Sequence, residues 1–202
     1  MDESMTSRFE RIRDVACDVV AQPQHPVTAC NLCGGSVFIV ISHRDRYGFP
    51  VEASGCRKCG LVFLNPVMTV EGYRDFYANT YRPLVSAYHG RLIDADSIQA
   101  EQRVYAIERA ALLAPFVGRV NPSTLLDVGG STGVVAHHLS NRFNLDATVI
   151  DPAPLEIEEA KRLGLEAFIG LAEEFDPGDR KFDFVVMCQT VDHLLDIDGT
   201  LR

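Results

Sequence analysis

Four of the six cysteines lie in two matching motifs, C-N-L-C-G and C-R-K-C-G, with 22 residues between them. Two residues between cysteines let both thiolates contact one ion, and the following glycine accepts the tight turn that such a knuckle needs. Two knuckles complete a tetrahedral four-sulfur set, which leaves no coordination position for water and is typical of structural zinc. A redox dithiol or a disulfide is the alternative. We expect zinc at Cys30, Cys33, Cys56 and Cys59.

A glycine-rich loop forms the second group of residues that could do chemistry. The run D-V-G-G-S-T-G, residues 127–133, places Asp127 at the end of an expected strand, followed by a turn and an expected helix. In that context the backbone can approach a ligand closely, and the helix N-terminus offers free amides. The spacing departs from the dinucleotide pattern G-x-G-x-x-G, and an acid beside the loop suits an ammonium group better than a pyrophosphate. The sequence therefore predicts a zwitterionic or cationic ligand.

Alternating strand and helix signals surround this loop from Asn121 onward. Such alternation predicts a parallel sheet with right-handed crossovers, and hence an α/β fold. The expected strands are residues 124–128, 146–151, 165–170 and 182–188, and the expected helices are residues 132–142 and 154–164.

The remaining chain is organised differently. Residues 6–21 have apolar positions at helical spacing, and short β-like runs separated by glycine and cysteine pairs follow them. A tyrosine-rich segment precedes a long helix, which we expect to stop near Pro115 and Gly118. The predicted domains are an N-terminal amphipathic helix (1–25), a zinc-ribbon module (26–66), a helical connector (67–120) and a partial Rossmann-like domain (121–202).

Composition and charge exclude several classes of function. The 202 residues are 47% hydrophobic and 23% charged, as in a globular protein rather than a disordered one. Residues 1–120 carry 13 basic and 13 acidic side chains, whereas residues 121–202 carry 6 and 15, so the acidic part would repel a nucleic acid. No apolar run approaches the roughly 20 residues that span a bilayer, and no secretory signal opens the chain. We expect a cytoplasmic protein without nucleic-acid or membrane partners.

These features together resemble the class I S-adenosylmethionine-dependent methyltransferases. In that family an acid, a glycine loop and a second acid closing the next strand recur in the order of Asp127, residues 129–133 and Asp151 here. The two knuckles, the second continuing as C-G-L-V-F-x-N-P, and the tyrosine-rich stretch are similar to a zinc-ribbon subgroup common among enzymes that modify sugars and other natural products. The resemblance implies S-adenosylmethionine as cofactor and a small-molecule methyl acceptor.

The resemblance also implies roles for individual residues. Asp127 and the loop would hold the methionine part of the cofactor, and Asp151 would accept both ribose hydroxyls. Ala172 would lie near the adenine and Gln189 near the sulfonium. His193 would act as general base for the acceptor, or would only position its loop. The expected cofactor-binding residues are Asp127, Gly129, Gly130, Ser131, Gly133, Asp151, Ala172 and Gln189.

The sequence departs from the family pattern in three ways. Ser131 stands at the middle glycine of the loop, and Leu171 stands where many relatives carry an aspartate for the adenine. Only four of the seven strands of such a domain are present, so we expect the first half of the fold alone. The fourth strand would then be an exposed apolar edge. This predicts either a shortened piece of a longer enzyme or self-association through that strand.

Two other functions stay open at this point. A non-catalytic zinc-ribbon scaffold is compatible with a missing substrate wall. The run Gly129-Gly130-Ser131-Thr132-Gly133 also satisfies the G-x-S-x-G elbow of serine hydrolases, although a hydrolase would need more strands before the elbow and its acid and histidine after it.

Overall fold

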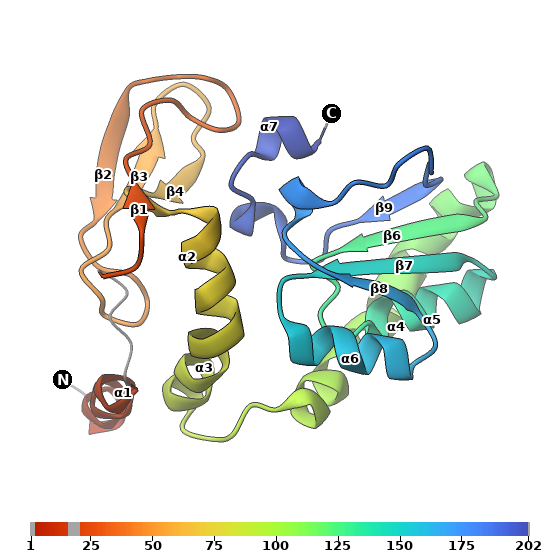
Figure 1. Cartoon of the computed structure of the whole chain (residues 1–202), viewed down its shortest axis with the longest axis horizontal. Coiled ribbons are helices and arrows are strands. Elements are labelled where there is room, and N and C mark those ends of the chain that lie inside the picture. The colour runs from red at the N-terminus through yellow and green to blue at the C-terminus, as the bar shows by residue number, and fades with distance from the viewer. Residues whose placement is uncertain (1–2, 16–20, 202) are drawn as a thin grey trace. The chain divides into compact units, whose positions relative to one another are not determined.

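The computed structural model describes residues 3–15 and 21–201, which form two compact units (Figure 1). The first unit comprises Met1–Ile93 and Leu195–Arg202, and the second comprises Asp94–Leu194. The predicted connector, residues 67–120, is thus divided between the units. Residues 195–202, at the end of the predicted Rossmann-like domain, group with the first unit.

Short antiparallel strands and helices make up the first unit. Its main sheet has the strand order β2-β3-β4, and β1 pairs with β5 separately. The bounds are α1 Glu3–Asp14, β1 Gln24–His25, β2 Phe38–Ser42, β3 Ala53–Cys56, β4 Val62–Leu64 and β5 Val67–Met68. The predicted N-terminal helix is present, but it begins earlier than residue 6, and residues 16–20 of the prediction lie outside the described part of the chain.

A nearly continuous helical run follows the β strands. It consists of α2 (Val70–Asp75), the π-helical turn η1 (Phe76–Thr80) and α3 (Tyr81–His89). The Thr69 hydroxyl accepts a hydrogen bond from the amide of Gly72, 3.2 Å away, and so caps the first turn. Packing of α3 against α1 buries Leu84, Ile12 and Tyr47 in one cluster. This small core holds the helices of the first unit together.

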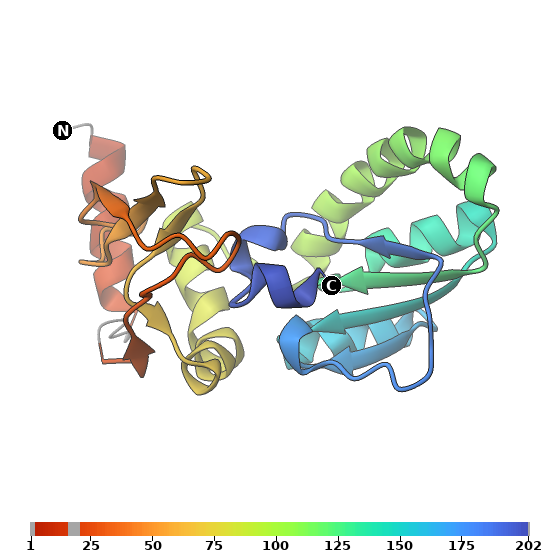
Figure 2. The same ribbon diagram turned by 90° about the horizontal axis from the view of Figure 1, so that it is seen from above.

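The second unit is a four-stranded parallel sheet with the order β8-β7-β6-β9. Its core cluster joins one face of the sheet to α4, α5 and α6, which lie on the same side in Figure 2. The other face carries a smaller cluster around Leu126, Val128 and Ile150. The bounds are α4 Ala95–Val120, β6 Thr124–Val128, α5 Val134–Phe143, β7 Asp146–Asp151, α6 Pro154–Arg162, β8 Glu166–Ile169 and β9 Phe184–Val186.

The long helix α4 corrects one sequence prediction. It continues through Pro115, one of the two predicted stops, and ends at Val120, two residues beyond the other, Gly118; there Asn121 adopts a left-handed conformation and its amide donates to the Val117 carbonyl. Proline inside a helix costs about 3 kcal/mol. We attribute the continuation to packing, because the helix buries Ala106, Ala110 and Val117, two of them in the core cluster.

Strand β9 is an edge strand, as predicted, because it pairs only with β6 in the described sheet. Val185 at its middle is half exposed. Short 3-10 turns follow the last two strands: η2 (Ala172–Glu174) after β8 and η3 (Val191–His193) after β9. Among the described residues, no helix has both the length and the apolar character needed to cross a membrane.

Candidate functional site

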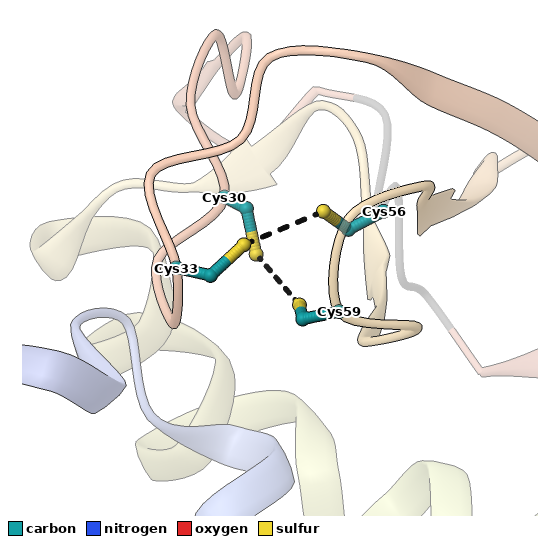
Figure 3. A group of neighbouring side chains, drawn as sticks. All are labelled: Cys30, Cys33, Cys56 and Cys59. Atoms are coloured by element: carbon teal, nitrogen blue, oxygen red, sulfur yellow. Dashed lines mark hydrogen bonds between the residues drawn. The ribbon is translucent and has the colours of Figure 1, made fainter.

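The four knuckle cysteines converge on a common centre (Figure 3). Their sulfur atoms all lie within 4.8 Å of one another, and the Cys30–Cys59 and Cys33–Cys56 sulfur pairs are each 3.6 Å apart. A regular tetrahedron with zinc–sulfur bonds of about 2.3 Å has edges of roughly 3.8 Å. The spacing therefore fits a four-coordinate metal and is far too long for disulfides.

The two knuckles have the same backbone construction. The amide of Gly34 donates to the carbonyl of Cys30 over 2.8 Å, and the amide of Gly60 donates to that of Cys56 over 2.9 Å. Both glycines have left-handed backbones, with φ of +68° and +81°, which a larger residue would adopt only under strain. The local sequence C-x-x-C-G thus folds each half of the site independently.

The sulfur atoms affect one another's ionisation. The amide of Cys59, assisted by that of Lys58, lowers the pKa of the Cys56 thiol to about 7. The amide of Leu61 acts to lower the pKa of Cys59, but hydrogen bonding to Cys33 and to Cys30, together with burial, raises it to about 12. Four thiolates so close together require a cation to balance their charge, and the all-sulfur donor set suits zinc.

The glycine loop follows β6 and can hold only glycine at three positions. Gly129 (φ +71°) lies so close to Thr190 that an added Cβ would stand 2.6 Å from its methyl carbon. A Cβ on Gly130 would lie 2.9 Å from the carboxylate of Asp127, and one on Gly133 (φ +75°) would lie 2.8 Å from the Cβ of Ala160. The loop is therefore packed against β6, α6 and the turn after β9.

Asp127 is fully buried beneath this loop. Among the described residues, neither of its carboxylate oxygens has a hydrogen-bond partner. Burial, together with the charge of Asp151 and against the opposing effect of Arg109, raises the pKa of Asp127 to about 7. A buried carboxylate without hydrogen-bond partners is costly, so its position favours a ligand that brings a cationic group.

Asp151, at the end of β7, is connected to the same loop. One carboxylate oxygen accepts a hydrogen bond from the Ser131 amide, and the other accepts one from the Ala153 amide, each over 2.9 Å. Ser131 adopts a left-handed conformation, with φ of 52°, to make this contact. The structure therefore brings the two acids and the loop together in one group.

A contact that the sequence did not reveal supports the loop from the opposite side. The buried hydroxyl of Thr132 donates to the side-chain oxygen of Gln102, on α4, over 2.7 Å. In the sequence, the hydroxyl of Thr132 beside the glycine turn is the only local sign of this contact. It does not indicate that the partner is Gln102, 30 residues earlier in the chain. Gln102 is thus a supporting residue of the site.

The other predicted site residues lie on turns at the ends of β8 and β9. Ala172 begins η2 and packs against the cluster containing Ile150. Gln189 has a left-handed backbone, with φ of 61°, directly before Thr190, which touches Gly129. His193 ends η3; its amide donates to the Thr190 carbonyl over 2.8 Å, and its ring lies 3.6 Å from the carboxylate of Asp192.

The hydrolase interpretation finds no support in this geometry. The Ser131 hydroxyl is buried and has no hydrogen-bond partner among the described residues, whereas a nucleophilic serine must contact a base. Its left-handed backbone serves the contact with Asp151 instead.

Sequence comparison identifies the family. A family model described as "Methyltransferase domain" matches residues 99–202, just over half of the chain. The chain therefore belongs to this methyltransferase domain family, and the predicted fold, an α/β parallel sheet of the class I methyltransferase type, is confirmed. A search of curated proteins found no match.

Solved structures of methyltransferases are similar to part of the chain. The plantazolicin methyltransferase BpumL, in complex with S-adenosylhomocysteine, is 17% identical, with 54% of this chain and 47% of that chain covered at a TM-score of 0.44. DesVI of Streptomyces venezuelae is 28% identical (43% and 36% covered, TM-score 0.36). CalS10 of Micromonospora echinaspora, an amino pentose methyltransferase with bound S-adenosylmethionine, is 24% identical (52% and 46% covered, TM-score 0.42).

The chain thus spans less than half the length of these three structures. Because the TM-scores lie below 0.5, the family assignment depends on the match to residues 99–202 alone.

Proposed function

We propose that the chain binds S-adenosylmethionine and transfers its methyl group to a small-molecule acceptor. The observation that carries this proposal is Asp127, a fully buried carboxylate whose two oxygens have no hydrogen-bond partner among the described residues. The cofactor's amino acid part has an ammonium group that would pair with such a carboxylate. Its adjacent carboxylate would accept hydrogen bonds from backbone amides in the first turn of α5.

Roles for the remaining site residues follow from their places at the strand ends. Asp151 would accept the ribose hydroxyls, a role that carboxylates at the ends of β strands often have. Ala172 would contact the adenine, and Gln189 would lie near the sulfonium. His193 would remove a proton from the acceptor. The cofactor supplies an activated methyl group with its own leaving group, so the protein mainly aligns the reactants and excludes water.

The acceptor class is a further part of the proposal. CalS10, one of the similar structures, is an amino pentose methyltransferase, and BpumL acts on plantazolicin. The 15 acidic against 6 basic side chains in residues 121–202 disfavour a nucleic acid. We therefore propose a sugar or another natural product as acceptor. The exposed edge of β9 is proposed as a surface for self-association.

Titration calorimetry with S-adenosylhomocysteine tests the cofactor site, because this product binds without turnover. We expect one-to-one binding that the Asp151→Ala variant weakens at least tenfold. The matched control is Asp146→Ala, which removes an exposed carboxylate at the other end of the same strand β7. Equal affinity in the wild type and the Asp151→Ala variant would contradict the ribose assignment.

The absence of binding by a folded wild-type protein would favour the scaffold alternative. Binding without turnover on a panel of amino sugars and peptides would favour it as well. A bound cofactor together with methylation of one class of acceptor would establish the enzyme.

The zinc ribbon is proposed to have a structural role. Cys30, Cys33, Cys56 and Cys59 would all serve as ligands, so no coordination position would be left for a reacting water molecule. Metal analysis of purified protein should give one zinc per chain. Protein that contains no metal and four free thiols while remaining folded would contradict this role.

A further inference from the structure

We propose that Asn31 is a positioning residue that couples the metal knuckle to the segment following the parallel sheet. Asn31 stands between the cysteines of the first knuckle, and it makes two hydrogen bonds to residues more than 160 positions away. Its side-chain amide donates to the Leu195 carbonyl over 3.2 Å, and its own carbonyl accepts from the Asp198 amide over 3.1 Å. One residue therefore contacts both the beginning of this C-terminal segment and its helix.

The C-terminal segment that receives these bonds is locally ordered. It contains the short helix α7 (Ile197–Thr200), whose N-cap Asp196 accepts a hydrogen bond from the Gly199 amide over 2.9 Å. The Asp198 amide is one of the donors that a helix start leaves without an intrahelical partner, and the Asn31 carbonyl satisfies it. Ile197 is buried, with 3% of its surface exposed. A bond to Asn31 thus fixes the whole short segment.

Metal binding would restrict the conformation of Asn31 in turn. The two cysteines on either side of it, Cys30 and Cys33, would bind the same ion, so its backbone would be held within a chelate ring. Without an ion, repulsion between thiolates this close together, 3.6 Å within each pair, would drive the sulfur atoms apart. We therefore expect loss of metal to loosen Asn31 and with it the contacts to Leu195 and Asp198.

The coupling reaches residues assigned to the cofactor site because of chain connectivity. Eight residues, 187–194, join the end of β9 at Val186 to Leu195. The bond from Asn31 to Leu195 holds the residue that directly follows this post-sheet segment, and loss of that bond would free the C-terminal end of the segment. The post-sheet segment contains Gln189 and His193. The significance of these two residues for methyl transfer rests on the proposed function. The bonds from Asn31 to Leu195 and Asp198, which we call the tether, do not depend on it.

Hydrogen exchange measured by mass spectrometry on the full, zinc-loaded chain tests the tether without cofactor. We expect Asn31→Ala to keep one zinc per chain and to raise exchange of residues 188–201 about fivefold, since a neutral hydrogen bond contributes on the order of 1 kcal/mol. Exchange in β6 and β7 should not change. The matched control is Arg57→Ala, at the same position in the second knuckle, where the backbone amide donates to Val37 instead.

Metal removal provides the second arm of the experiment. A chelator added to the wild type should raise hydrogen exchange of residues 188–201 at least as much as the Asn31→Ala substitution does. Added to the Asn31→Ala variant, the chelator should cause a smaller further rise. If Asn31→Ala reduces the zinc content, the isosteric Asn31→Asp, which lacks the donor, should give the same fivefold rise with zinc retained. The proposal is wrong if either zinc-loaded variant exchanges like the wild type, or if chelation leaves residues 188–201 unchanged.

The outcome is separable from that of the cofactor titration. A protein that shows the tether but binds no S-adenosylhomocysteine would contradict the proposed function alone. Normal binding with unchanged exchange in the Asn31 variants would contradict the tether alone.

Discussion

Replacing Asp127 by asparagine should stabilise the ligand-free protein at alkaline pH while abolishing cofactor binding. The carboxylate is fully buried without hydrogen-bond partners among the described residues, and its pKa is raised from 3.8 to about 7 by burial and by the charge of Asp151, against the opposing effect of Arg109. Each pKa unit corresponds to 1.36 kcal/mol, so ionised Asp127 destabilises the fold by roughly 4 kcal/mol. The Asp127→Asn variant has the same shape and no charge.

The sign of the pH dependence follows from proton binding. Between about pH 4 and pH 7, the unfolded chain releases the Asp127 proton while the folded chain retains it. The free energy of unfolding therefore falls as the pH rises through this range, and it levels off above the folded-state pKa. From these two pKa values, the stability advantage of the Asp127→Asn variant should grow by roughly 2 to 3 kcal/mol between pH 5 and pH 8.

Urea unfolding of the zinc-loaded protein at pH 5 and pH 8 measures this difference. Asp183→Asn is the control, because its carboxylate accepts hydrogen bonds from Ser123 and Thr124, which lower its pKa to about 2. Its contribution to stability is present above pH 4 and is lost only as the pH falls toward 2. The Asp183→Asn variant should therefore be destabilised equally at pH 5 and pH 8. Parallel pH profiles for the wild type and the Asp127→Asn variant would refute the reasoning.

Three further substitutions test other parts of the structure. Cys56→Ser should reduce bound zinc to well below one per chain, measured by metal analysis, and normal zinc content would contradict the four-sulfur site. Gly133→Ala should lower the free energy of unfolding by about 1–3 kcal/mol, since the residue has φ of +75° and its Cβ would press on α6; unchanged urea unfolding would show that the loop can move. Val185→Lys, at the exposed middle of β9, should shift any dimer toward monomer in sedimentation velocity, and an unaffected dimer would exclude this edge.

The features predicted correctly from the sequence are those whose signal is local. A C-x-x-C-G knuckle forms its own turn through the Gly34 and Gly60 amides, and each apolar strand is marked by its own residues. The acid at the end of β6 and the acid at the end of β7 come together because neighbouring parallel strands end at one edge of the sheet. Periodicity and connection rules suffice for such features.

Features decided by long-range packing were missed. A proline is a local stop signal, yet α4 continues through Pro115 because Val117 and the alanines before it are buried on one face. The contacts of Asn31 with Leu195 and of Thr132 with Gln102 join side chains far apart in sequence. Asn31 and Thr132 are both ordinary polar residues for a knuckle and a turn, respectively. No pattern in the sequence therefore distinguishes them from polar residues that contact only solvent.

The contacts within the glycine loop hold it in one conformation before any ligand binds. Ser131 donates to Asp151, and Gly130 lies against the Asp127 carboxylate, so the loop already has a defined conformation in the ligand-free chain. A ligand entering this site would lose little free energy to ordering the loop. The favourable free energy of ligand binding would then come from pairing the Asp127 carboxylate with a cation. In the ligand-free protein, the rest of the domain must offset the cost of burying that carboxylate. Such a site lowers the folding stability of the ligand-free protein and raises its affinity for a cationic ligand. The Asp127→Asn substitution should raise the stability and lower the affinity.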